Sequence, residues 1–296
     1  MQFPLPALHM GILFSVVALF SWGIGDFLIQ KSARKFGDWI ALFYITAFGS
    51  IILFPFVYKD LGALLWNEQG LIILSIAGLV MTFAAYFEFE ALRIGKISII
   101  EPINAFEIAM TGFLATIFLK EFLNFWQIIS IIALMVGIFL VATKSFYNFK
   151  YIKWEKGVIF AIFAMIGMGT SNFLFGIGSR ITNPLLINWF ANTCIALICL
   201  IFLTKQTKIK NIFSDLKDNT RLIVSVSFID NLAWVCFSYA TLYIPIAIAT
   251  GISESYIALA AILGIKFNQE KLKLHQKLGL TLTIVAAIFL AFITKD

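Results

Sequence analysis

Ten long apolar segments, arranged as two sets of five, constrain this 296-residue chain more than any other feature. Each is close to the length of about 20 residues that an α-helix needs to cross a bilayer core. Hydrophobic residues make up 61% of the chain and charged residues 13%, a composition that a water-soluble domain could not cover with polar surface. We therefore predict an all-α membrane protein with ten transmembrane helices. The expected spans are residues 8–30, 38–58, 70–92, 97–119, 125–143, 157–179, 184–203, 221–243, 245–266 and 274–293.

The two sets of segments are similar in sequence. A shift of 146 positions aligns the first helix with the sixth and gives seven identities in 27 positions. The same shift places Asp26 opposite Asn172. The chain therefore has the pattern of a duplication. We expect one five-helix repeat at residues 1–150 and a second at residues 151–296.

The basic residues predict that the two repeats are inverted. A unit with five helices must be inserted the opposite way up when it is repeated, so its flanking charges should change sides. Of the 22 Lys and Arg residues, 18 fall on one predicted side and 4 on the other. The positive-inside rule makes the richer side cytoplasmic and places both termini outside the cell membrane. The net charge of +6 is then an orientation signal and requires no nucleic-acid partner.

Acidic residues inside the spans are the strongest functional signal after the repeat. A buried carboxylate costs several kcal/mol unless it is protonated, paired or hydrated. The only Lys and Arg residues inside the predicted spans, Arg221, Lys266 and Lys277, lie within four residues of a span end. The excess of one sign indicates a water-accessible cavity that takes up protons or a cation. Apart from Asp38, the first residue of its span, the acidic residues inside the spans are Asp26, Glu88, Glu90, Glu101, Glu107, Asp230 and Glu254.

Helical spacing groups polar and aromatic side chains of several spans into stripes that we expect to line one central cavity. Counting along the spans places Glu107, Asn192, Asp230 and Glu254 near mid-membrane. For each candidate the alternative is a hydrogen bond or a packing contact between helices. The candidate substrate-binding residues are Trp22, Asp26, Glu101, Asn104, Glu107, Asn172, Asn188, Trp189, Asn192, Asp230, Trp234, Ser253, Glu254 and Tyr256.

Other acidic residues have structural interpretations. Glu88 and Glu90 point about 160° apart on a helix, so at most one can face the cavity. Glu90 is spaced to pair with Arg93 at i, i+3. Glu121 and Glu270 lie at span ends, where helix capping or an interface contact is expected rather than solute binding.

Several short motifs carry a family resemblance. They are Trp22-Gly23 and Met168-Gly169 in the opening helix of each half, and Glu121 and Glu270 followed six residues later by Gln127 and Gln276. With the five-plus-five helices, these motifs resemble the drug/metabolite transporter superfamily, specifically its ten-helix EamA-type carriers. The resemblance covers nearly the whole chain and implies a central cavity enclosed by helices of both halves. Family members are commonly oriented with cytoplasmic termini, whereas the charge distribution here predicts the reverse.

The expected function is secondary active transport of a small organic metabolite by alternating access, with proton coupling or exchange. Because the predicted spans contain more acidic than basic residues, we expect an amino acid, an amine or a related cationic or zwitterionic solute. A flippase for lipid or lipid-linked solutes, a passive channel and an intramembrane enzyme remain alternatives. Catalytic motifs, a metal-binding triad and a cofactor-binding loop are absent from the sequence. The expected partners are the solute, membrane lipid and protons or a cation, with a monomer and a homodimer both open.

Overall fold

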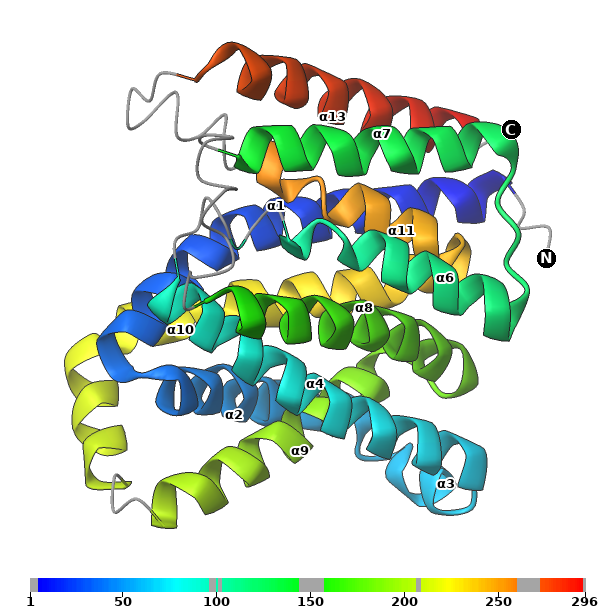
Figure 1. Ribbon diagram of the computed structural model, residues 1–296. Coiled ribbons are helices and arrows are strands. Elements are labelled where there is room, and N and C mark those ends of the chain that lie inside the picture. The colour runs from blue at the N-terminus through cyan, green and yellow to red at the C-terminus, as the bar shows by residue number, and fades with distance from the viewer. Residues whose placement is uncertain are drawn as a thin grey trace.

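A computed structural model describes residues 5–95, 100, 103–143, 157–205, 209–259 and 272–294 (Figure 1). Within these ranges the regular structure is helical. Eight of the helices are long and apolar enough to span a membrane, and two shorter ones are also apolar. The helices are α1 (Leu5–Phe36), α2 (Asp38–Val57), α3 (Leu61–Leu65), α4 (Glu68–Ile94), α6 (Glu107–Leu119), α7 (Phe125–Ala142), α8 (Val158–Ile181), α9 (Pro184–Lys205), α10 (Ile209–Tyr243), α11 (Ile246–Ser253) and α13 (Leu274–Ile293).

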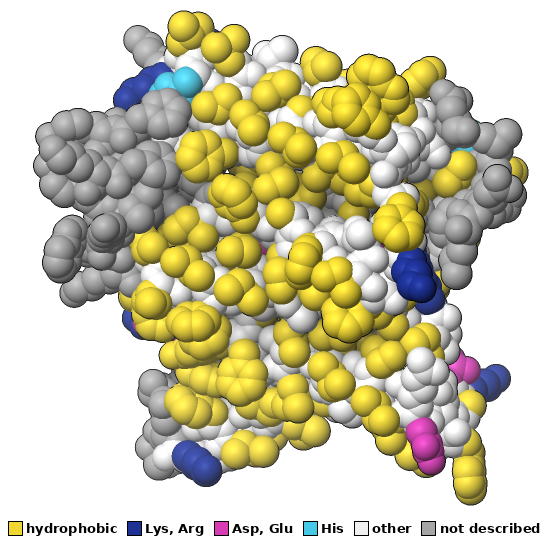
Figure 2. All heavy atoms as spheres, turned by 45° about the vertical axis from the view of Figure 1, so that its right-hand side comes forward, with side chains coloured by type: hydrophobic (Ala, Val, Ile, Leu, Met, Phe, Trp, Pro, Cys, Tyr) yellow, Lys and Arg dark blue, Asp and Glu magenta, His cyan; other side chains and the backbone are white. Residues whose placement is uncertain are grey.

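The exterior of the bundle is apolar. Figure 2 shows hydrophobic side chains over the middle of one face, with the charged side chains toward its margins. Large side chains such as Phe56 and Phe83 are 67% and 62% exposed, which would be costly in water and is ordinary in contact with lipid. The prediction of an all-α, multi-pass membrane protein is therefore confirmed.

The helices of the two halves run in opposite directions. Figure 1 shows α1 and α8, the first helices of the halves, crossing the bundle in opposite senses. We call the end where α1 finishes and α13 begins the basic end, because Lys31, Arg34 and Lys277 lie near it. The opposite end, where α1 begins and α13 finishes, is called the terminal end. The first residue of α1, Leu5, and the last residue of α13, Ile293, therefore lie toward this second end (Figure 1).

The main helix contacts join the halves and do not remain within them. Helix α1 packs on α10, α4 on α8, α2 on α9, and α7 on α13. The α7–α13 contact is close at Gly137 and Gly279, where a Cβ atom on Gly279 would lie 2.7 Å from the Gly137 carbonyl oxygen. Small residues allow this approach, as is common between membrane helices. The two halves are therefore interleaved.

The repeated glutamines now have a structural role. Asn124 precedes α7, and its backbone N–H donates to the Gln127 side-chain oxygen at 3.0 Å. Lys273 precedes α13, and its backbone N–H donates to the Gln276 oxygen at 3.1 Å. Each glutamine thus satisfies a backbone donor at the start of the last helix of its half. The sequence repeat marks a repeated helix start.

Two expected spans are interrupted. The span predicted at 97–119 lies partly outside the described residues, and its helix α6 begins only after a turn at Ala105 and Phe106. The span predicted at 245–266 breaks where α11 ends, at a turn formed by Glu254 and Ser255. The turns are 149 positions apart, the separation that relates the two glutamine motifs.

Side-chain hydroxyls accompany the second interruption. Ser255 Oγ donates to the Gly251 carbonyl at 2.9 Å, a back-bond that competes with the helical ladder. Helix α10 also differs from expectation, because it begins at Ile209 rather than residue 221 and has a non-helical backbone at Asn219. The first turns of α10 are polar in sequence and lie at the basic end. A helix there does not need apolar side chains, so α10 extends beyond the apolar span.

Candidate functional site

One cavity lies between the halves and is lined by side chains from α1, α2, α4, α6, α8, α9 and α10, and by Glu254 and Tyr256, which follow α11. Its accessible volume of about 80 Å³ has room for several water molecules, so the polar groups on its wall can be hydrated. Ten of the predicted residues share this lining. They are Trp22, Asp26, Glu107, Asn172, Asn188, Asn192, Asp230, Trp234, Glu254 and Tyr256.

On α1, α2 and α4 the residues that line the cavity lie in the half of each helix toward the basic end. The α1 lining comes from Trp22, Asp26 and Ile29, which follow one helix face toward the end of that helix. The opposite part of α1 is packed instead, because Phe14 stacks on Tyr239 with ring centroids 5.2 Å apart. In this conformation the cavity is therefore one-sided.

Three aromatic rings form the cavity wall nearest the packed half, and we call them the aromatic floor. Trp234 of α10 lies between Trp22 of α1 and Phe175 of α8, with centroid distances of 5.2 Å and 4.7 Å. Behind them Phe237 is fully buried and contacts both tryptophans.

Three carboxylates gather on one wall of the cavity. Asp26 accepts a hydrogen bond from the Tyr256 side chain. Asp230 and Glu254 both lie close enough to Asp26 to interact with its charge. The described lining contains no Lys or Arg. A cluster of half-buried like charges with no basic partner in the lining favours protons or a cationic solute between them.

Amide side chains on the second half cross-link the bundle. Asn192 donates to the Asn231 side-chain oxygen at 2.7 Å. Asn231 in turn donates to the Ile45 carbonyl at 3.0 Å, which joins α10 to α2. Asn188 donates to Ser238 Oγ at 2.7 Å. For these three amides the helix-to-helix alternative is realised, although each still lines the cavity.

Four predicted residues do not belong to the described lining. Glu101 lies outside the described residues. Asn104 is buried beside the interruption before α6, and Trp189 turns toward Phe54 at a centroid distance of 6.1 Å. Ser253 is fully buried and donates to the Ser15 carbonyl at 3.4 Å. Because α11 ends at Ser253, regular helical spacing does not extend from it to Glu254.

The lining also contains polar residues that we did not predict. Glu88 faces the cavity, while Glu90 pairs with Arg93 at 2.6 Å, which confirms the expected ion pair. Thr46 and Asn231 are new members. Asn231 precedes Trp234 by three residues, so the helical stripe on this span could have revealed it. Thr46 has no comparable signal, because its segment is almost entirely apolar.

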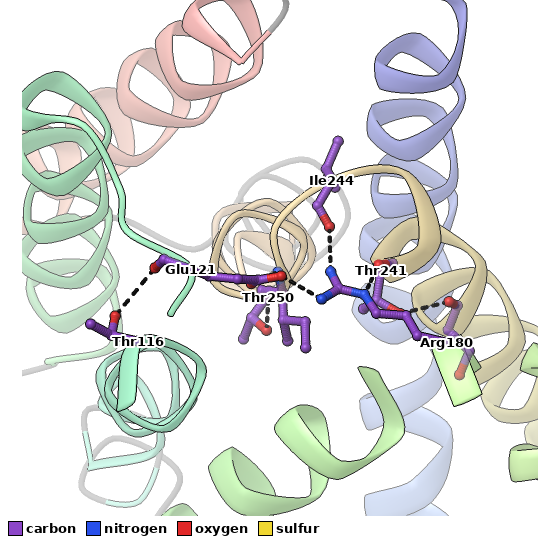
Figure 3. A network of polar contacts seen from close by, with 8 residues as sticks. Thr116, Glu121, Arg180, Thr241, Ile244 and Thr250 are labelled. Atoms are coloured by element: carbon purple, nitrogen blue, oxygen red, sulfur yellow. Dashed lines mark hydrogen bonds and ion pairs between the residues drawn. The ribbon is translucent and has the colours of Figure 1, made fainter. Parts of the chain in front are cut away.

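A second charged cluster lies at the terminal end, where the last turns of α8 and α10 meet the first turn of α11 (Figure 3). Glu121 and Arg180 form an ion pair there, with side chains only 14% and 17% exposed. Arg180 also donates to the Thr241 carbonyl at 2.8 Å and the Ile244 carbonyl at 3.2 Å. The other carboxylate oxygen of Glu121 accepts the Ile246 backbone N–H at 2.9 Å.

This cluster joins the halves through neutralised charges. Glu121 lies at the N-terminus of α11 and Arg180 at the C-terminus of α10, so each charge also complements a helix dipole. The expectation that Glu121 has a capping or interface role is therefore confirmed. Its counterpart Glu270 lies outside the described residues. Arg180, which sequence analysis placed among the flanking charges, is part of the packed bundle.

Comparisons with known proteins agree with this architecture. Residues 9–143 and 155–292 each match the EamA-like transporter family. An uncharacterised protein of Methanocaldococcus jannaschii is 28% identical over 136 residues, which are 45% of this chain and 96% of that protein. A solved structure described only as "Crystal structure of protein" superposes with a TM-score of 0.74 over 96% of this chain and 97% of its own, at 10% identity. This last likeness concerns the fold alone.

Proposed function

This chain belongs to the EamA-like transporter family, and on that premise we propose that it carries a small organic cation or zwitterion across the cell membrane by alternating access. Family membership implies membrane transport of a small molecule. The charge of the solute is our inference from the cavity. Amines and amino acids are the compounds that best fit this description.

The acidic wall is the observation that supports this solute class. Asp26 comes from α1, Asp230 from α10 and Glu254 from the turn that follows α11, and all three line one cavity. An ammonium group placed among them would satisfy buried charge that the described lining leaves without a basic partner. The aromatic floor adds ring faces that attract cations. Protons can occupy the same carboxylates when the solute is absent, which would couple transport to a proton gradient.

The one-sided cavity supports alternating access. In an inverted repeat, exchanging the conformations of the two halves would close one end and open the other. The terminal end is held closed by the aromatic floor and by the Glu121–Arg180 cluster. By the positive-inside rule the basic end faces the cytoplasm, so this conformation would receive solute from inside.

Uptake by purified protein in liposomes tests the proposal. We expect saturable uptake and counterflow of labelled amines or amino acids, stimulated by a pH gradient. Asp230→Asn and Glu254→Gln should each reduce uptake strongly, while Glu68→Gln, at an exposed acid at the start of α4, serves as the control. Normal transport by Glu107→Gln, Asp230→Asn and Glu254→Gln would refute the acidic site. Uptake without saturation or counterflow would identify a channel instead.

A further inference from the structure

Two polar side chains flank the aromatic floor at equivalent positions of the two halves. Asp26 lies one turn beyond Trp22 on α1, and Asn172 lies three residues before Phe175 on α8. Because α1 and α8 run in opposite directions, both residues are on the basic-end side of the floor. Both line the cavity. The repeat thus places a carboxylate on one side of Trp234 and an amide on the other.

Both of these side chains have a polar atom with no partner. Asp26 Oδ2 is a buried acceptor without a hydrogen bond, although the carboxylate also interacts with Tyr256. Asn172 is 1% exposed, and its Nδ2 is a buried donor without a hydrogen bond. Leaving a buried donor unpaired is unfavourable, so such groups are normally satisfied by protein, water or ligand. The pair offers one acceptor and one donor to the same space.

The other amides of the described lining do not share this property. The nitrogen of Asn188 donates to the Pro184 carbonyl and to Ser238 Oγ, both at 2.7 Å. The Asn192 and Asn231 nitrogens are used in the cross-link between α9, α10 and α2. A purely structural role therefore accounts for these three amides. It does not account for Asn172, whose Nδ2 donor is directed to no protein acceptor.

Resting on the proposed function above, we propose that Asn172 is the residue that selects for an oxygen atom on the solute. The ammonium group of the solute lies at Asp26, and the Asn172 amide donates to a carboxylate, carbonyl or hydroxyl oxygen of the same molecule. The apolar body of the solute then covers the aromatic floor. The favoured class is an amino acid or amino alcohol rather than a simple amine. Because the described lining has no basic side chain, an uncharged oxygen should bind at least as well as a carboxylate.

Three compounds with one aromatic body test this inference. Phenylalanine, phenylalaninol and 2-phenylethylamine share a phenyl ring and an ammonium group, and only the first two carry an oxygen. Their dissociation constants for wild-type protein in lipid nanodiscs can be measured by isothermal titration calorimetry. We expect phenylalaninol or phenylalanine to bind about tenfold more tightly than phenylethylamine, which corresponds to about 1.4 kcal/mol. Asn172→Leu should abolish this preference while phenylethylamine affinity changes less than about twofold.

Two further variants separate selection from general damage to the cavity. Asn192→Leu also alters the lining, and it should weaken all three compounds in proportion and keep their ratio. Asn172→Ala removes the donor without adding bulk to the cavity wall, so it should lose the preference even if Asn172→Leu does not fold. A preference that survives both Asn172 substitutions would overturn the inference. Equal affinities of the wild-type protein for all three compounds would also overturn the inference. The proposed function would remain intact in that case, because phenylethylamine binds. Binding of none of the three compounds would overturn both.

Discussion

Acidic side chains that are partly buried in the bundle have opposite surroundings at the terminal end and in the cavity. At the terminal end Glu121 is matched by Arg180 and by the first backbone N–H of α11. In the cavity Asp26, Asp230 and Glu254 are near one another, and no basic residue lies in the described lining. The Glu121–Arg180 arrangement stabilises a contact between the halves. The cavity carboxylates instead require a cation or protons from outside the protein to balance their charge. Under the proposed function, neutralised charge marks a structural contact, and charge without a basic partner marks the binding site.

The comparison is tested most strongly by Asp26→Asn. We expect the kcat/KM for amine uptake in liposomes to fall about 100-fold, because a hydrogen bond to a charged group is lost. The melting temperature should be unchanged or higher, because one buried like charge is removed. Intrinsic fluorescence during heating measures the second quantity. A large drop in melting temperature with normal uptake would assign Asp26 to the structural group.

A double-mutant cycle at Glu121 and Arg180 should give the reverse result. Glu121→Gln and Arg180→Met should each lower the free energy of unfolding, with a coupling energy of about 2 kcal/mol between them. Denaturation in mixed micelles provides the four values. Binding of amines to the cavity should be retained by the folded variants. Additive effects would mean that the ion pair contributes nothing beyond its separate hydrogen bonds.

Cysteine accessibility should distinguish the two halves of α1. In a background with Cys194, Cys199 and Cys236 replaced by Ala, a membrane-impermeant thiol reagent should modify Ile29→Cys about tenfold faster than Ser15→Cys. Ile29 lines the cavity, while Ser15 is fully buried in the packed half. Glu121→Gln should reduce the difference between the two modification rates, because it weakens the packing at the terminal end. Equal rates in the parent background would contradict a one-sided cavity.

The smallest effect is expected at Arg93, the other arginine with acidic partners. It contacts Asp38 at 2.9 Å and Glu90 at 2.6 Å, but its side chain is 43% exposed. Exposed ion pairs contribute about 0–1 kcal/mol, so Arg93→Gln should change the free energy of unfolding by less than about 1 kcal/mol. Denaturation in mixed micelles again measures this free energy of unfolding. A loss as large as that of Arg180→Met would show that burial does not separate the two clusters.

Sequence reasoning located the spans and most of the polar lining, because both depend on local composition and helical spacing. It did not find the interruptions at Ala105 and at Glu254, since neither turn contains Gly or Pro. It also could not pair Glu121 with Arg180, which are 59 positions apart and belong to different halves. The unpaired donor of Asn172 depends on which carbonyls its neighbours occupy. These features are set by tertiary packing and leave no local pattern.

The interleaved packing of the halves has a consequence for biosynthesis. Helix α1 has its main partner in α10, and α4 has its main partner in α8. A nascent chain that has inserted only its first five helices therefore presents faces whose neighbours have not yet been translated. Assembly must wait for the second half, so a chain divided within residues 144–156 should regain its structure only when both fragments are expressed together.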